Sequence, residues 1–165
     1  MNDFGVPLVR LVVGGFMLSH SLPKLDDSDH EYAKSFERLG FRPGATFVMR
    51  AAAAETSAAV LIGLGAFGPI GPTLLLSDMI VAMLSVAAQE EKFDPSKHEL
   101  EALYGSIAAM VALSGPGRFA MDRALGIDGL NKTWLRLLSL ASAAAGAAFM
   151  LSQREPSKHR QHRAI

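Results

Sequence analysis

The sequence VPLVRLVVGGFMLSHSLP, residues 6–23, is an apolar run that carries only two ionisable side chains, Arg10 and His20. Four more apolar runs follow it along the chain, at residues 45–67, 72–88, 100–115 and 133–152. A helix needs about 20 residues to cross the ~30 Å hydrocarbon core of a bilayer. We therefore predict five transmembrane helices, and we expect the third and the fourth to be short for this purpose.

The distribution of charge supports this interpretation. Most charged residues lie in four segments, 24–45, 89–101, 116–136 and 153–165. The exceptions are Asp3, Arg10, Arg50, Glu55 and Asp78. A bilayer imposes such segregation, because a charge near its centre costs at least about 2.5 kcal/mol on insertion scales. Helices buried in a soluble bundle would show polar stripes at helical spacing, and these runs mostly lack them. The sequence therefore predicts an all-α integral membrane helical bundle.

The composition argues against several classes of function. The 16 basic and 16 acidic side chains cancel, whereas nucleic-acid-binding domains usually carry a basic excess. The chain has no cysteine, so it has no disulfide framework, thiolate nucleophile or cysteine-built metal site. His20 is the one histidine within an apolar run, and bis-histidine haem ligation needs two facing imidazoles. We therefore expect no nucleic-acid partner, no metal and no haem.

Two other segments carry recognisable patterns. Residues 28–40 place Tyr32, Phe36 and Leu39 at i, i+4 and i+7, which predicts a short amphipathic helix on the membrane interface. The last apolar run is rich in small residues, and the spacing of Ala141 and Ala145 predicts a face for close helix packing.

Ionisable residues inside membrane spans are candidates for function, because their burial must be offset by partners. At about 100° per residue, Arg10, His20 and Lys24 share one face of the first helix. Glu55 lies near the middle of the second span. An unpaired carboxylate there would be protonated, because desolvation disfavours its charged form, whereas a partner from the first helix, Arg10 or His20, would keep it ionised. Asp78 is either a polar packing contact or a second carboxylate that faces Glu55.

Each candidate also has a structural interpretation. Arg10 and Lys24 lie near helix ends, where long cationic side chains reach the lipid head groups. His20 can hydrogen-bond to a neighbouring helix, and Glu55 can belong to a structural ion pair. Glu99, at the start of the fourth apolar segment, fits ordinary helix-end electrostatics.

The ordered set of motifs resembles the DoxX family. The first helix of this family usually has an Arg-Leu start, a glycine-containing middle and a His-Gly-x-x-Lys-Leu end. Here these features are Arg10-Leu11, Gly14-Gly15, His20 and Lys24-Leu25. Ser21 stands where the family usually has glycine.

The resemblance continues to about residue 125. Residues 51–65, with Glu55 and a closing Gly-Leu-Gly, resemble the second helix of the family. Residues 99–104 and the segment GPGRFAMD, residues 115–122, resemble its fourth helix and its terminal signature. We therefore expect a DoxX-like four-helix transmembrane domain at 1–125, an additional C-terminal transmembrane helix at 126–152 and a basic polar tail at 153–165.

The resemblance implies a multi-pass protein of a bacterial or archaeal inner (cytoplasmic) membrane. Some members are linked to thiosulfate:quinone oxidoreduction, and others to membrane oxidoreductase complexes that handle oxidative stress. Carried onto this chain, it implies catalytic roles for Glu55 and His20, and cofactor-binding roles for Arg10, Lys24, Glu99 and Arg118.

Two functional hypotheses follow. In the first, a quinone binds between the first two helices, His20 or Lys24 donates a hydrogen bond to it, and Glu55 relays a proton. The protein would then be a subunit of a quinone-linked oxidoreductase, with electrons from a soluble oxidoreductase subunit. In the second, the chain is a non-enzymatic membrane scaffold or anchor for such a partner. Either form is compatible with a homo-oligomer.

Overall fold

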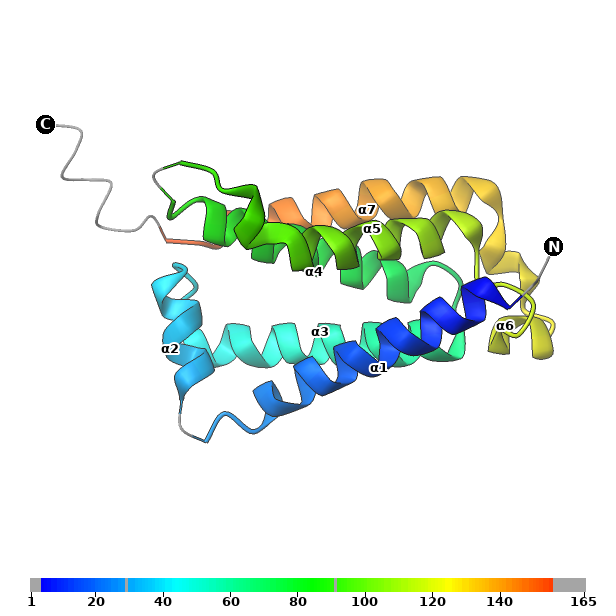
Figure 1. Cartoon of the computed structure of the whole chain (residues 1–165), viewed down its shortest axis with the longest axis horizontal. Helices are drawn as coiled ribbons and strands as arrows, with labels where there is room; N and C mark the ends of the chain where they lie inside the picture. Colours follow the sequence, from blue (N-terminus) through cyan, green and yellow to red (C-terminus); the bar gives the residue numbers. More distant parts are fainter. Residues whose placement is uncertain (1–3, 29, 91, 156–165) are drawn as a thin grey trace, which may run out of the picture.

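Five long helices run side by side along the length of the molecule (Figure 1). The computed structural model describes residues 4–28, 30–90 and 92–155. The five helices are α1 (Gly5–Leu25), α3 (Gly44–Leu64), α4 (Ile70–Ala87), α5 (Glu99–Ser114) and α7 (Thr133–Ser152). They coincide with the five predicted runs to within a few residues, and no strand occurs within the described ranges.

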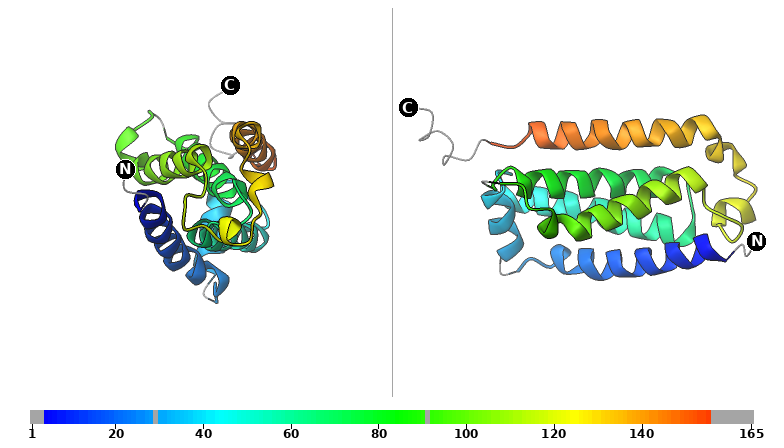
Figure 2. Two further views of the ribbon diagram at one scale, coloured as in Figure 1. Left: turned by 90° about the vertical axis from the view of Figure 1, so that its right-hand side faces the viewer. Right: turned by 45° about the horizontal axis from the view of Figure 1, so that its top comes forward.

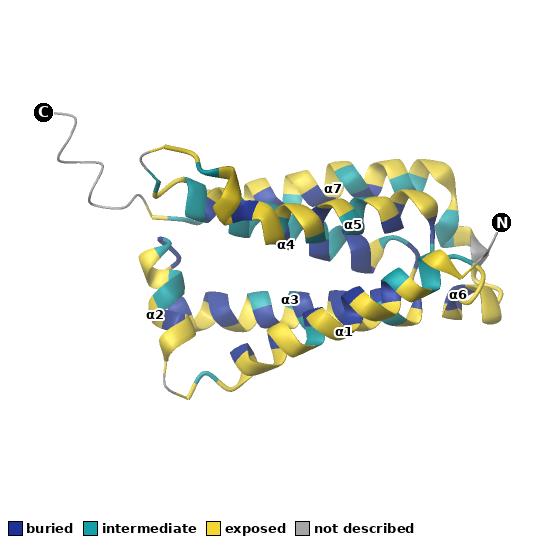
Figure 3. Cartoon of the chain, in the orientation of Figure 1, coloured by how far each residue is buried: buried dark blue, intermediate teal, exposed yellow. Residues whose placement is uncertain are grey.

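The long helices have the dimensions and the surface of a membrane bundle. Four of them, α1, α3, α4 and α7, are long and apolar enough to span a bilayer. Helix α5 has 16 residues, fewer than the roughly 20 that a full crossing needs, as its apolar run predicted. Figure 3 shows exposed residues along the outer faces of the helices. Large apolar side chains on these faces include Leu8, Leu11, Phe16, Leu137 and Phe149. The prediction of an all-α membrane bundle is confirmed.

Short helices lie at the two ends of the bundle. Helix α2 (Glu31–Arg38) crosses one end, and α6 (Met121–Ala124) lies at the other (Figure 1). The 3₁₀ turns η1 (Pro95–His98) and η2 (Asp128–Asn131) lead into α5 and α7. The long helices form two layers, with α1 and α3 in one and α4, α5 and α7 in the other (Figure 1, Figure 2).

Helix α2 ends just before a glycine that can adopt the left-handed backbone conformation. Gly40 has φ +93°, and the Phe41 N–H donates to the Phe36 carbonyl at 3.0 Å. The rings of Phe36 and Phe41 lie 6.0 Å apart, which is the apolar contact expected at such a helix end. The predicted short helix within residues 28–40 is confirmed.

Helices α1 and α3 approach each other closely. A Cβ atom on Gly14 would lie 2.8 Å from the Ala59 carbonyl oxygen, so only glycine fits there. The Thr56 hydroxyl donates to Ser21 Oγ at 2.9 Å. Together these contacts fix the antiparallel register of the two helices. The buried core around them consists of Val13, Met17, Ala58, Ala59, Ile62, Leu75, Met79 and Ala108.

Helix α7 packs through a different face from the predicted one. Its buried residues are Ser139, Ala143 and Ala147, whereas Ala141 and Ala145 are exposed. The predicted packing face was wrong because residues 139–148 of this helix are almost all small on every side. Its sequence therefore does not determine which side is buried.

Candidate functional site

A cavity of about 690 Å³ lies between the two layers, in the half of the bundle nearest α2. All five long helices and α2 contribute to its lining. Its volume falls within the range of about 300–1,000 Å³ that is typical of ligand sites. Most of its lining side chains are apolar, including Phe36, Phe41, Phe47 and Leu74.

A buried ion pair between α1 and α3 lies on this cavity. Lys24 Nζ donates to Glu55 Oε1, and the two side chains are only 9% and 3% exposed. The sequence predicts Arg10 or His20 as the partner of Glu55, and this prediction is wrong because Lys24 takes that place. The register set by Gly14 instead brings the last turn of α1 beside Glu55.

The second oxygen of Glu55 is available for a further interaction. Glu55 Oε2 is buried and has no hydrogen-bond partner among the described residues. Asp78 of α4 lines the same cavity and interacts electrostatically with both Glu55 and Lys24. Asp78 is therefore the second carboxylate near Glu55, which was one of the two interpretations of the sequence. The ion pair and Asp78 together supply two carboxyl groups and one ammonium group.

Other polar groups lie around the ion pair. His20 is exposed on α1 and lines the same cavity as the ion pair. Glu101 and Tyr104 line it from the first turns of α5, and Glu101 Oε2 is buried without a hydrogen-bond partner among the described residues. The arrangement of an apolar wall with a few polar groups suits an amphipathic ligand.

Arg10 lies at the opposite end of the bundle, where backbone carbonyls surround it. Its guanidinium donates to the carbonyl oxygens of Ile62 at 2.9 Å and Gly63 at 3.1 Å, at the end of α3. It also donates to the carbonyls of Pro116 and Phe119 in the loop after α5. The side chain is therefore occupied in joining α1 to two other segments.

Two other predicted site residues also lie outside the cavity lining. Glu99 is exposed at the first position of α5, two residues before Glu101. Arg118 is exposed at the α6 end, beside a surface depression that Gly117 and Phe119 also line. The predicted cofactor-binding roles of Arg10, Glu99 and Arg118 stay predictions, and the cavity brings together His20, Lys24 and Glu55.

Asp122 has a structural role that we did not predict. Its two carboxylate oxygens accept the backbone N–H groups of Phe67 at 2.8 Å and Gly68 at 2.6 Å, and the residue is 2% exposed. It therefore fixes the turn between α3 and α4. Its place in the segment GPGRFAMD was the available signal, because a carboxylate after a Gly-Pro-Gly loop can satisfy such N–H groups.

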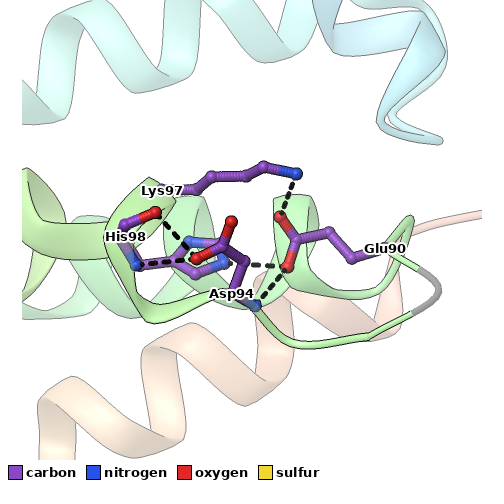
Figure 4. Close-up of polar contacts among 5 residues, drawn as sticks. Glu90, Asp94, Lys97 and His98 are labelled. Atoms are coloured by element: carbon purple, nitrogen blue, oxygen red, sulfur yellow. Dashed lines mark hydrogen bonds and ion pairs between the residues drawn. The ribbon is translucent and has the colours of Figure 1, made fainter.

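A second polar cluster lies in the connection between α4 and α5 (Figure 4). Glu90 Oε2 accepts the Asp94 N–H at 3.1 Å and lies 3.4 Å from His98 Nε2, while Lys97 Nζ lies 3.3 Å from Oε1. The Asp94 N–H and the neighbouring His98 and Lys97 lower the pKa of Glu90. In the part of the chain that the structure describes, no three His, Asp or Glu side chains form a group that could hold a metal ion.

Comparison with known proteins identifies the family. The family model described as DoxX matches residues 5–88, just over half of the chain, which covers α1 to α4. No curated protein and no solved structure matches the chain. The matched segment contains both members of the Lys24–Glu55 ion pair and the start of α1 with Arg10. The chain is a multi-pass membrane protein that belongs to the DoxX family.

Proposed function

We propose that this protein binds a quinone in the cavity around Lys24 and Glu55, and that it acts in the inner (cytoplasmic) membrane with a soluble oxidoreductase partner. The observation that carries this proposal is the buried ion pair in the wall of an otherwise largely apolar cavity, in which Glu55 Oε2 has no hydrogen-bond partner among the described residues. The membrane location and the partner follow from the family resemblance.

The residues present suit the polar head of a quinone. Lys24 Nζ has three hydrogen-bond donors, and Glu55 Oε1 accepts one of them. Another can reach a carbonyl oxygen of the ring. His20 offers a second donor on the same cavity. The apolar walls suit the flat ring.

We further infer that the cavity opens toward lipid, which would give an apolar tail an outlet. Phe16 of α1 and Leu100 of α5 both line it, yet they are 61% and 57% exposed on the outer surface. Lining residues that also face outward indicate a lateral opening toward lipid between these two helices. An isoprenoid tail could leave the bundle by this route.

A quinone, when bound, supplies an acceptor for two electrons and two protons. Lys24 stabilises the negative charge that develops on the carbonyl oxygen, because its ammonium group is fixed in a site of low dielectric. Glu55 relays a proton to the same oxygen. The electrons come from the partner, since the chain has no cysteine pair to carry them.

The test is the quinone content of the detergent-purified full chain. We expect the wild-type protein to retain quinone and Lys24→Met to bind it at least about tenfold more weakly, because a charge-assisted hydrogen bond contributes about 1.5–3 kcal/mol. The matched control is Lys34→Met, which removes a lysine from an exposed pair with Glu31 on α2. Recovery of a stoichiometric soluble partner without any quinone would contradict the proposal and favour the scaffold.

A further inference from the structure

The charges that face the cavity do not balance. The titratable groups that line it are His20 and Lys24 from α1, Arg50 and Glu55 from α3, Asp78 from α4, and Glu101 and Tyr104 from α5. The lining residues from α2 and α7 add none. With His20 neutral, two cations face three carboxyl groups.

The imbalance is concentrated at the ion pair. Arg50 is exposed, lies 5.2 Å from the Phe47 ring centroid and donates to the Gln153 side chain at 3.4 Å. Glu101 also has a buried Oε2 without a hydrogen-bond partner among the described residues, but it lies in the first turn of α5, where the helix dipole favours a carboxylate. Lys24 is therefore left to compensate both Glu55 and Asp78.

Two ionised carboxylates around one ammonium group are unfavourable away from water, because like charges repel and each has lost its hydration. Glu55 Oε1 already receives the Lys24 ammonium, and Oε2 has no partner among the described residues. A proton on Asp78 would remove the excess charge. It would also supply a donor for Oε2.

We propose that Asp78 holds a proton that it shares with Glu55 Oε2, so that Lys24, Glu55 and Asp78 together form a neutral proton store beside the cavity. The existence of this store depends only on the three side chains. Its use in quinone reduction rests on the function proposed above.

In that use, Glu55 passes the shared proton to the carbonyl oxygen as two electrons arrive from the partner oxidoreductase. The carboxyl O–H bond breaks, and an O–H bond forms on the ring. Asp78 then takes a proton from water at the α2 end, and the same route delivers the second proton. Asp78 acts through Glu55, so its role is to hold and position the proton.

Infrared spectroscopy of the detergent-purified full chain without added quinone at neutral pH tests the store. A protonated carboxyl group has a C=O stretch separate from the carboxylate bands, and it shifts in D₂O. Carboxyl groups in water titrate at about pH 4 and stay ionised under these conditions. We expect a band equivalent to one carboxylic acid per chain.

Three variants follow from the charge balance. Asp78→Asn should lose the band, because Lys24 then neutralises Glu55 alone. Glu55→Gln should also lose it, because Lys24 then neutralises Asp78. Lys24→Met should gain a second band, since neither carboxyl group then has a cation. The control Ser77→Ala, a neighbouring cavity residue of α4, should keep the single band.

Persistence of the band in Asp78→Asn would place the proton elsewhere and overturn the proposal. Persistence in Glu55→Gln would also overturn it, because Asp78 would then be protonated without sharing. Absence of the band from the wild-type protein would overturn it as well. Since the spectra need no quinone, a failure to bind quinone leaves this result unchanged.

Discussion

At the scale of single residues, two buried cations of α1 have partners of different kinds. Lys24 faces a carboxylate and a cavity, whereas Arg10 faces backbone carbonyls from α3 and from the loop after α5. A guanidinium group suits the second task, because its donors form a rigid planar fork that reaches several acceptors at once. In the sequence, both residues are charged side chains in or directly after the first apolar run. Only the structure distinguishes their roles.

Substitution of Arg10 should therefore destabilise the protein. Arg10→Met removes the bonds to four carbonyl oxygens, and we expect a loss of about 3 kcal/mol or more, since hydrogen bonds to charged groups contribute about 1.5–3 kcal/mol each. Arg10→Lys should be intermediate, because an ammonium group cannot reach the same set of acceptors. Thermal unfolding in detergent measures both. An unchanged unfolding temperature in Arg10→Met would contradict this role.

At the scale of elements, the α4–α5 connection depends on ionised carboxylates (Figure 4). Hydrogen bonds from the Asp94 N–H, His98 and Lys97 lower the pKa of Glu90, and the hydroxyl and N–H of Ser96 lower the pKa of Asp94. A carboxyl group with a lowered folded pKa stabilises the fold above its unfolded pKa, and this stabilisation is lost as the pH falls through the folded value.

We accordingly expect the connection to loosen below about pH 4, where such groups ordinarily titrate. Hydrogen exchange of the backbone amides of residues 94 and 96–99, corrected for the intrinsic effect of pH, should accelerate over this range. Glu90→Gln should exchange faster already at neutral pH and show a flatter pH dependence. Glu31→Gln, in the exposed pair on α2, serves as the control that leaves this segment unchanged.

The helices themselves were predictable, because the segregation of charge marks the ends of each membrane span. Which face of each helix is buried was predictable only where the side chains around that helix differ in size or charge. In α1, Gly14 marks the contact with α3, whereas residues 139–148 of α7 are almost all small and the predicted face was wrong. The pairing of Glu55 with Lys24 depends on the register between α1 and α3, and this register cannot be read from the sequence of either helix alone.

At the scale of the whole molecule, helix α7 contributes to the wall of a cavity whose other lining residues include many from the segment that matches the DoxX family. The matched segment ends at residue 88, yet Gly146, Phe149 and Met150 of α7 line the cavity. The residues after α7 then reach across to the α2–α3 corner. Arg154 Nε donates to the Leu39 carbonyl at 2.8 Å, and the Glu155 N–H donates to the Gly40 carbonyl at 2.8 Å.

Gly40→Ala tests this contact between the two ends of the fold. A Cβ atom there would lie 2.6 Å from the Glu155 carbonyl oxygen, and the residue has φ +93°. We expect a loss of about 1–2 kcal/mol from backbone strain and a further loss from the displaced C-terminal segment.

Two control substitutions separate these effects in thermal unfolding. Gly126→Ala has a positive φ, but no atom of the described residues lies within 4 Å of the new Cβ, so it reports strain alone. Gly129→Ala has neither feature and should be neutral. Equal losses in Gly40→Ala and Gly126→Ala would show that the contact with Glu155 contributes nothing.

The central claim is that the cavity around Lys24 and Glu55 is a quinone site, and cross-linking with a photoreactive quinone measures it most directly. Labelled positions in the detergent-solubilised full chain would be mapped by mass spectrometry, with and without excess unmodified quinone. We predict labels within the cavity-lining segments 16–24, 47–55 and 100–104, and their loss under competition. Labels confined to residues 117–124 at the α6 end, or labels on lipid-facing positions that competition does not reduce, would contradict the claim.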